Sequence, residues 1–225
     1  MVAFLTQIMV GIKLITLEYI NMQNIFSILI SLFIMSSCSK KEEPKFQKIK
    51  YDLSSNYKDS LGTKIIPNKK YQYWAYMSYY QNSGKEKHTV LKQGGDTLEK
   101  KHININHNIL GFFEGCHPNY CCNYAVTVES DKLEYLKTKE QFRKFLGTID
   151  NLEEAMLLAR TYDYILDADI KGSAYRIINE YYELHLMKFH EYPPQKESIE
   201  IKIDKKGNIK TKSLGFYCKG QKCYE

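Results

Sequence analysis

An alternation of apolar and charged residues near the carboxyl end constrains the fold of this chain most tightly. Across Ser198–Asp204, isoleucine alternates with charged residues, which is typical of a strand with one buried and one solvated face. The next strand-like segment, Ile209–Tyr217, follows after the short link Lys205–Asn208. A link of hairpin length joins antiparallel neighbours, because a parallel pair needs a crossover of about a dozen residues or more. The sequence therefore predicts an antiparallel sheet.

Further strand-like segments lie on both sides of the middle of the chain. The densest is Tyr71–Tyr80, which is rich in the aromatic residues that favour strands. Three more hairpins are predicted: 88–92 with 97–105 around Gly94-Gly95-Asp96, 124–129 with 133–137 around Ser130-Asp131-Lys132, and 174–178 with 181–190 around Asn179-Glu180.

Between these two groups of strands the apolar spacing becomes helical. Thr138 and Gln141 match a capping box, and Gly147 ends the helix that follows. Asp150 and Glu153 repeat the capping pattern before a second helix. The apolar faces comprise Phe142, Phe145 and Leu146 in the first helix and Leu152, Ala155, Met156, Ala159 and Tyr162 in the second.

The order of these elements predicts the fold class and the domains. Strands, then helices, then strands with hairpin-length links favour an α+β fold. We expect one antiparallel sheet, built from the N- and C-terminal hairpins, with the two central helices packed on one face. Residues 69–225 form this single domain, residues 38–68 read as a flexible polar tether, and residues 1–37 precede it.

Composition excludes one class of partner. The chain carries a net charge of +6, but its lysines are dispersed. A nucleic-acid surface would show a basic block interleaved with aromatic residues, and no such block is present in the sequence, so no nucleic-acid partner is expected. A negatively charged partner is compatible with the charge.

An apolar run near the start of the chain ends at a cysteine. Ile25–Met35 is broken only by two serines and is too short to span a membrane, which needs about 20 residues. The small residues Ser36 and Ser37 come next, then Cys38 and the charged segment Ser39–Glu43. This order resembles the lipobox of bacterial lipoproteins with a type II signal peptide, and the resemblance covers about residues 22–43.

The resemblance implies a lipid anchor and a location. A diacylglycerol would be attached to the sulfur of Cys38, cleavage would precede it, and the new amine would be acylated, so that several chains hold the protein stably on a membrane. We expect Met22, rather than Met1, to be the true start. Ser39–Glu43 also resembles the charged segment that bacteroidete-type lipoproteins use for surface display. The expected location is the cell envelope, on either face of the outer membrane.

Five further cysteines follow the lipobox. They lie in two clusters and comprise Cys116, Cys121, Cys122, Cys218 and Cys223. In an oxidising envelope such pairs are usually disulfides, and sequence alone leaves the connectivity open. Cys116 could join either Cys121 or Cys122, or a link could join the two clusters. A zinc site that includes His117, or a catalytic thiolate with His117 as base, is the less favoured alternative.

One acidic segment resembles the start of a calcium loop. Asp167–Gly172 has the first acidic residues of such a loop, but Lys171 stands where an oxygen ligand is needed. A turn is therefore expected there, and neither a metal nor a cofactor is predicted for the chain.

The aromatic segment is the one candidate binding surface in the sequence. Tyr73, Trp74, Tyr76 and Tyr79 occupy both faces of their strand. They form either a core strand or an exposed platform on which sugar rings or a partner protein stack. The site would take a protein or glycan ligand.

No catalytic motif accompanies these features. The sequence lacks a phosphate loop, a GxSxG elbow, an HExxH helix and a dinucleotide fingerprint. The function predicted is a non-catalytic binding or structural role in a lipid-anchored envelope protein. The alternatives are a secreted or envelope hydrolase that uses an acid pair or a thiol and, by analogy alone, a disulfide-bonded inhibitor of a host enzyme.

Overall fold

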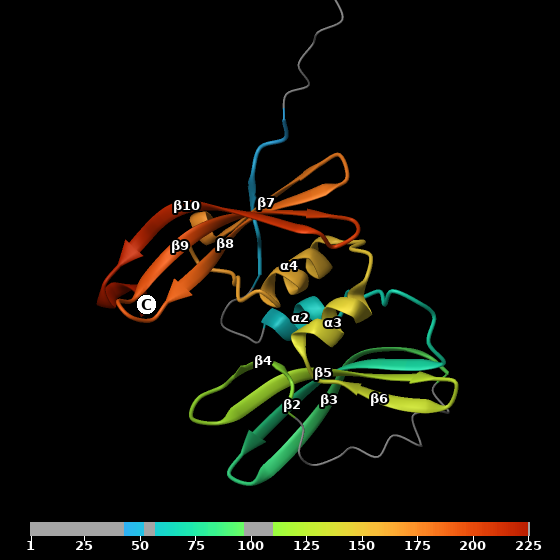
Figure 1. Cartoon of the computed structure of the whole chain (residues 1–225). Coiled ribbons are helices and arrows are strands. Elements are labelled where there is room, and N and C mark those ends of the chain that lie inside the picture. The colour runs from blue at the N-terminus through green and yellow to red at the C-terminus, as the bar shows by residue number, and fades with distance from the viewer. Residues whose placement is uncertain (1–42, 52–56, 97–109, 225) are drawn as a thin grey trace, which may run out of the picture. The chain divides into compact units, whose positions relative to one another are not determined.

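The computed structural model describes residues 43–51, 57–96 and 110–224 of the chain (Figure 1). Pro44–Glu225 forms one compact unit. Its strands pair antiparallel in two separate sheets, so the fold is mainly β with a few short helices. The antiparallel prediction is confirmed, whereas the prediction of one sheet built from all the hairpins is wrong.

Sheet A is built mainly from the C-terminal third of the chain. Its strand order is β1-β7-β8-β9-β10, in which β7 to β10 follow one another as hairpins and β1 is added at the edge beside β7. The strands are β1 (Gln47–Lys48), β7 (Ser173–Ile178), β8 (Tyr181–His190), β9 (Gln195–Asp204) and β10 (Ile209–Lys219).

Sheet B is built from the first half of the domain. Its order is β3-β2-β5-β4, and β6 pairs with β5 beyond the end of β4. The strands are β2 (Tyr73–Asn82), β3 (Lys85–Gly95), β4 (Phe112–Gly115), β5 (Tyr120–Glu129) and β6 (Lys132–Leu136).

The helices lie between the two sheets and not on one face of a single sheet (Figure 1). One buried apolar cluster joins Tyr76 and Phe112 of sheet B, Phe142 of α3, and Leu184 and Ile201 of sheet A. The helices are α2 (Tyr57–Gly62), α3 (Lys139–Leu146) and α4 (Leu152–Arg160), with the 3-10 turns η2 (Ile170–Gly172) and η3 (Gln221–Tyr224).

Helix α4 shows why the predicted helix arrangement is wrong. The predicted stripe residues Ala155, Met156 and Ala159 are buried, but Leu157 and Leu158 on its other sides are buried as well. A helix that is apolar around most of its circumference needs cover on more than one side. Leu157 and Leu158 are visible as apolar residues in the sequence, but a prediction based on one apolar stripe leaves them out.

The predicted helix ends are largely confirmed. The Thr138 hydroxyl accepts from Gln141 N, the Gln141 side chain accepts from the Thr138 backbone, and Gly147 caps α3 with φ 62°. The N-cap of α4 is Asn151 rather than Asp150, because the Asn151 side chain accepts from Glu154 N. The capping pattern was therefore placed one residue early.

Most predicted turns are confirmed, and one is misplaced. Hairpins form around residues 130–131, 179–180 and 205–208. The turn predicted at Gly94–Asp96 is not the turn of β3, because β3 reaches Gly95 and its hairpin with β2 turns at Ser83-Gly84. The strand predicted over 97–105 lies outside the described residues.

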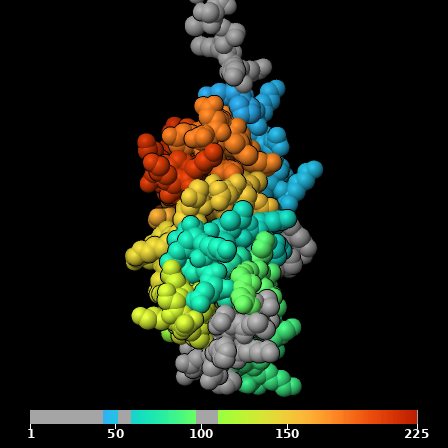
Figure 2. Space-filling model, turned by 90° about the vertical axis from the view of Figure 1, so that its right-hand side faces the viewer, coloured from blue at the N-terminus to red at the C-terminus, as the bar shows by residue number. Residues whose placement is uncertain are grey.

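The described part of the predicted tether is folded. Strand β1 pairs with β7, and Ile49, Leu61 and Ile65 are buried in the apolar cluster. The buried carboxylate of Glu154 accepts from Ile66 N at 2.6 Å, which fastens this segment to α4. In Figure 2 the N-terminal segment lies along the strands of sheet A. The compact unit therefore begins at Pro44 and not near residue 69.

A glycine in α2 lets the helix approach sheet B closely. A Cβ atom at Gly62 would lie 2.0 Å from Cε1 of Tyr76, whose ring is fully buried. We expect Gly62→Ala to lower the free energy of unfolding by about 1–3 kcal/mol, as overpacked cores do. Urea unfolding followed by tyrosine and tryptophan fluorescence measures this loss. An unchanged midpoint would contradict the close packing of α2. Gly115→Ala is the comparison, because the nearest atom to a Cβ there would lie 3.9 Å away, at ordinary contact distance.

Candidate functional site

A cleft of about 620 Å³ opens where both sheets and both central helices meet. Its walls come from β4, from the link before α3, from the end of α4 and from the end of β8. The lining residues are Gly111, Phe112, Phe113, Glu114, Lys137, Thr138, Lys139, Arg160, Asp163, Ile165, Phe189 and Glu191.

Aromatic rings form the apolar part of this cleft. Phe112 and Phe113 are adjacent on β4, both are buried, and their rings meet edge to face at 5.0 Å. The backbone of Phe113 has a φ of 58°, in the left-handed region that non-glycine residues seldom adopt. Adjacent residues of a regular strand would point to opposite faces. This departure lets both rings join the same apolar cluster.

Charged groups form the rim. The Arg160 guanidinium lies over the Phe113 ring at 5.2 Å, and Lys139 Nζ is 2.5 Å from Asp163 Oδ1. The hydroxyl and backbone of Thr138 are engaged in the capping box of α3. Apolar rings beside guanidinium and carboxylate groups suit a ligand with an apolar face and a hydrogen-bonding edge.

One disulfide closes the loop beside β4. Cys116 and Cys121 are bonded, with their Cα atoms 5.5 Å apart. In the same hairpin the Tyr120 hydroxyl donates to Glu114 Oε1 at 3.1 Å, and Glu114 lines the cleft. The disulfide thus constrains the wall that sheet B contributes.

The second disulfide constrains the opposite wall. Cys218 and Cys223 are bonded, with their Cα atoms 5.7 Å apart, in the segment that includes η3. The ring of Tyr224 packs on Phe189 at 5.5 Å, and Phe189 lines the cleft. Of the pairings left open by sequence, the structure therefore selects Cys116–Cys121 and Cys218–Cys223. Cys122 belongs to neither and is buried.

Removing either disulfide should cost a similar amount of stability. Each closes a ring of about six residues, and loop entropy assigns such a ring about 2 kcal/mol. We expect Cys116→Ser/Cys121→Ser and Cys218→Ser/Cys223→Ser each to lower the free energy of unfolding by that amount. Guanidinium unfolding without reductant measures it. If reduction of the wild-type protein leaves its midpoint unchanged, these pairs are not bonded.

The two disulfides consume most of the thiols that a zinc site or a catalytic thiolate would need. Four of the five cysteines are oxidised, so no thiolate remains at Cys116 or Cys121 beside His117. Among the residues that the structure describes, no three His, Cys, Asp or Glu side chains gather as a metal site requires. In the calcium-like segment, Asp167 instead accepts from Lys196 at 3.1 Å and from Tyr217 at 2.7 Å.

The aromatic strand proposed as a platform is a core strand. Trp74 and Tyr76 face the helices, while Tyr73 and Tyr79 belong to a second buried cluster on the other face of sheet B. All four are at most 7% exposed, so none presents a surface for stacking. Aromatic density predicted burial here, and the binding interpretation of these residues is wrong for this structure.

Glu183 is the most buried carboxylate of sheet A, and it is neutralised. It accepts from Arg176 and Lys202, at 2.7 and 2.6 Å. Burial opposes its ionisation, but these hydrogen bonds outweigh burial and hold the pKa of Glu183 below its usual value. The nearby Glu180 pairs with Lys205. The two carboxylates are therefore structural ion-pair partners and not an acid–base pair.

The cleft could not be found from the sequence. Its members Phe113, Arg160 and Phe189 come from separate segments and form no motif. The two cysteine clusters were the one available signal, since each lies next to a cleft wall. The cysteine spacing indicates two constrained loops, but it does not indicate that both loops flank the same cleft.

No protein-family model, curated protein or solved structure matches this chain. Within the described residues, no helix has both the length and the hydropathy to cross a bilayer. Function therefore has to be inferred from the geometry of this chain.

Proposed function

We propose that the protein is a lipid-anchored envelope protein that binds a ligand without chemical turnover. Cys38 carries the lipid, the location is the cell envelope of a bacterium, and the cleft between the two sheets receives a protein or glycan ligand. One observation carries the binding role: disulfide-closed segments from different sheets support opposite walls of the same cleft.

The disulfides support export. Bonds of this kind form and persist in oxidising compartments and are rare where thiols are kept reduced. A compact unit that begins at Pro44, six positions after Cys38, also suits a chain whose preceding segment is removed or serves as an anchor.

The cleft chemistry supports binding over catalysis. Its charged groups are split between cations and carboxylates, and Lys139 and Asp163 neutralise each other. The one hydroxyl side chain in the lining, that of Thr138, is engaged by Gln141 in the capping box of α3. Aromatic rings with a charged rim match the faces and edges of sugar rings or of amphipathic protein side chains.

Mass spectrometry of the membrane fraction tests the anchor. We expect an N-terminal peptide that begins at an acylated Cys38, together with disulfide-linked peptides for both cysteine pairs. The variant Cys38→Ser should leave the membrane fraction and lose the acyl mass. Retention of that variant on membranes, with no mass change beyond the substitution, would end the lipoprotein proposal.

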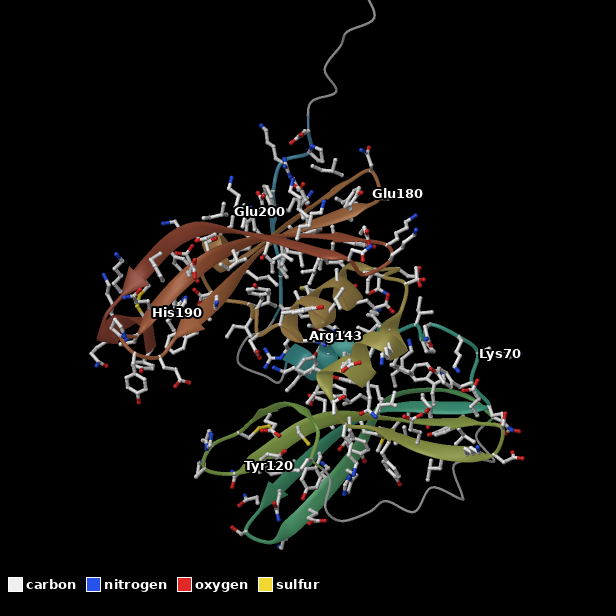
Figure 3. All side chains as sticks on the ribbon, in the orientation of Figure 1. Lys70, Tyr120, Arg143, Glu180, His190 and Glu200 are labelled. Atoms are coloured by element: carbon white, nitrogen blue, oxygen red, sulfur yellow. A yellow bond between two sulfur atoms is a disulfide. The ribbon has the colours of Figure 1, made fainter. Side chains whose placement is uncertain are left out.

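Ligand-observed NMR with panels of soluble oligosaccharides and peptides tests the cleft. Arg160→Gln removes the cation over Phe113 inside the cleft. The control, Arg143→Gln, removes a cation of α3 that lies over the Tyr162 ring, and neither of these two residues lines the cleft (Figure 3). We expect a bound compound to lose at least about tenfold in affinity with Arg160→Gln, since a desolvated cation–π or charged contact is worth about 2 kcal/mol. Equal affinity for both variants would place binding elsewhere.

A further inference from the structure

Sheet A carries a strip of cations on the face that points away from the helices. Leu184, Ile199 and Ile201 face the buried cluster, so the alternate residues of β8 and β9 face outward. Figure 3 shows Glu200 on this outer side. Residues that lie directly opposite each other in neighbouring strands point to the same face of the sheet, so the register also identifies the outward residues of β1, β7 and β10. Its cations, which we call the basic strip, are Lys48, Arg176, Lys202, Lys210 and Lys212.

The basic strip exceeds the carboxylates beside it. Glu183 and Glu200 are the acidic members of the same rows, and Glu183 is shared between Arg176 and Lys202. Glu200 approaches His185 Nε2 at 3.9 Å. At the two ends of the face, Asp204 accepts from Asn208, and Asp167 is paired with Lys196. The five cations of the basic strip therefore share these rows with two carboxylates, which leaves the face with a positive surplus.

Lys210 stands where internal stability does not favour it. Lys210 lies directly opposite Lys202 in the register, whereas Lys212, two residues along the same edge strand, lies opposite Glu200. Like charges that oppose each other across strands are destabilising. An external anionic surface would offset this repulsion and turn the cluster into a contact.

The N-terminal segment joins the folded body on this same face. Arg176 Nη1 donates to Pro44 O at 3.4 Å. The Arg176 guanidinium lies over the Phe46 ring at 4.6 Å, and this ring also stacks on the His185 ring at 3.9 Å. Lys48 Nζ donates to Ala168 O at 2.9 Å. The chain toward Cys38 therefore leaves from the rim of the basic strip.

Chain length brings this face to the membrane. Six residues from Cys38 to Pro44 reach at most about 20 Å, at 3.3–3.6 Å per residue. The five strands of sheet A place β10 about 19 Å from β1, at about 4.8 Å per strand. If Cys38 is anchored as proposed above, the basic strip can reach the headgroups, where each cation contributes to attraction by an anionic surface.

We propose that the outer face of sheet A docks on an anionic phospholipid surface through the basic strip. The lipid anchor and this face then act together. This inference rests on the proposed anchor for its geometry, but the docking surface binds lipid without acylation and can be tested separately.

The test uses the chain from residue 38 with Cys38→Ser, which keeps the whole compact unit and carries no lipid. Co-sedimentation compares vesicles of phosphatidylglycerol and phosphatidylcholine with vesicles of phosphatidylcholine alone, at an ionic strength of about 0.1 M, where the Debye length is about 10 Å. We expect binding to the anionic vesicles only. Lys210→Gln/Lys212→Gln should reduce the partition coefficient about 30-fold, since each lysine near such a surface contributes about fivefold.

Lys85→Gln/Lys87→Gln is the matched control. Both lysines are exposed on β3, the edge strand of the other sheet, so the change in charge and in edge protection is the same. We expect this variant to bind like the parent. Equal loss in both variants, or no binding of the parent to anionic vesicles, overturns the docking proposal. Neither result bears on the proposed lipid anchor, which is tested separately by whether Cys38 is acylated. Unchanged urea midpoints show that both variants remain folded.

Discussion

Replacing Phe142 by alanine should lower the free energy of unfolding by about 3–5 kcal/mol. Phe142 is fully buried and lies at the centre of an aromatic cluster on α3. Its ring centroid is 4.4 Å from that of Phe112, 5.6 Å from that of Tyr76 and 5.8 Å from that of Phe113. The variant would leave a cavity between α3 and sheet B that rigid neighbours on several sides cannot fill.

Guanidinium unfolding followed by fluorescence measures this loss, and Phe216→Ala is the control. Phe216 is 47% exposed on edge strand β10, so its truncation should cost less than about 1 kcal/mol. If both variants lose the same amount, Phe142 does not occupy a packed core. If Phe142→Ala loses ligand binding and Phe216→Ala does not, the reason is that Phe142 packs against Phe112 and Phe113, which line the cleft.

Glu183→Gln should lower the free energy of unfolding by about 3 kcal/mol at neutral pH. The Glu183 side chain is 5% exposed and holds Arg176, which is 17% exposed, and Lys202. Breaking a buried pair by removing one partner leaves a charge uncompensated, which costs about 3–5 kcal/mol. We take the lower end because 45% of Lys202 is exposed. Glu180→Gln, in an exposed pair with Lys205, should cost at most about 1 kcal/mol.

The same carboxylate gives the protein an acid-sensitive range. The pKa of Glu183 is lowered from 4.5 in the folded protein. Its contribution to stability is complete above the pKa of the unfolded chain and is lost as pH falls through the lower, folded pKa. We expect the free energy of unfolding of the wild type to fall below about pH 4.5. In Glu183→Gln this part of the pH dependence should flatten, and an unchanged slope would contradict the assigned role.

Local signals in the sequence were sufficient for most individual elements. The capping box at Thr138, the alternation across Ser198–Asp204 and the turn at residues 130–131 are each set by neighbouring residues, and each is confirmed. The misplaced turn at Gly94–Asp96 has a local reason as well. Ser83-Gly84 offers the same turn chemistry, with φ values of 47° and 79°, and it stands between two longer strand segments.

Division into two sheets could not be read from local patterns. It depends on which strands share a buried cluster with the helices, and Tyr76 and Ile201 meet that cluster from opposite sides. The polar composition of residues 44–68 predicts a tether, but a few apolar residues, such as Leu61, pack in the core and fix the segment there. The cleft, assembled from distant segments, depends on the same tertiary arrangement.

The placement of Cys122 bears on how the protein acquires its correct bonds. Neighbouring residues of β5 point to opposite faces, so Cys122 lies in the buried cluster with Tyr73 and Tyr79, while its neighbour Cys121 bonds Cys116. A wrong Cys116–Cys122 bridge would force β5 to slip by one residue and invert both of its faces. The register of β5 therefore discriminates between the two bridges: the Cys116–Cys121 bond is compatible with the native sheet, and a Cys116–Cys122 bond is not.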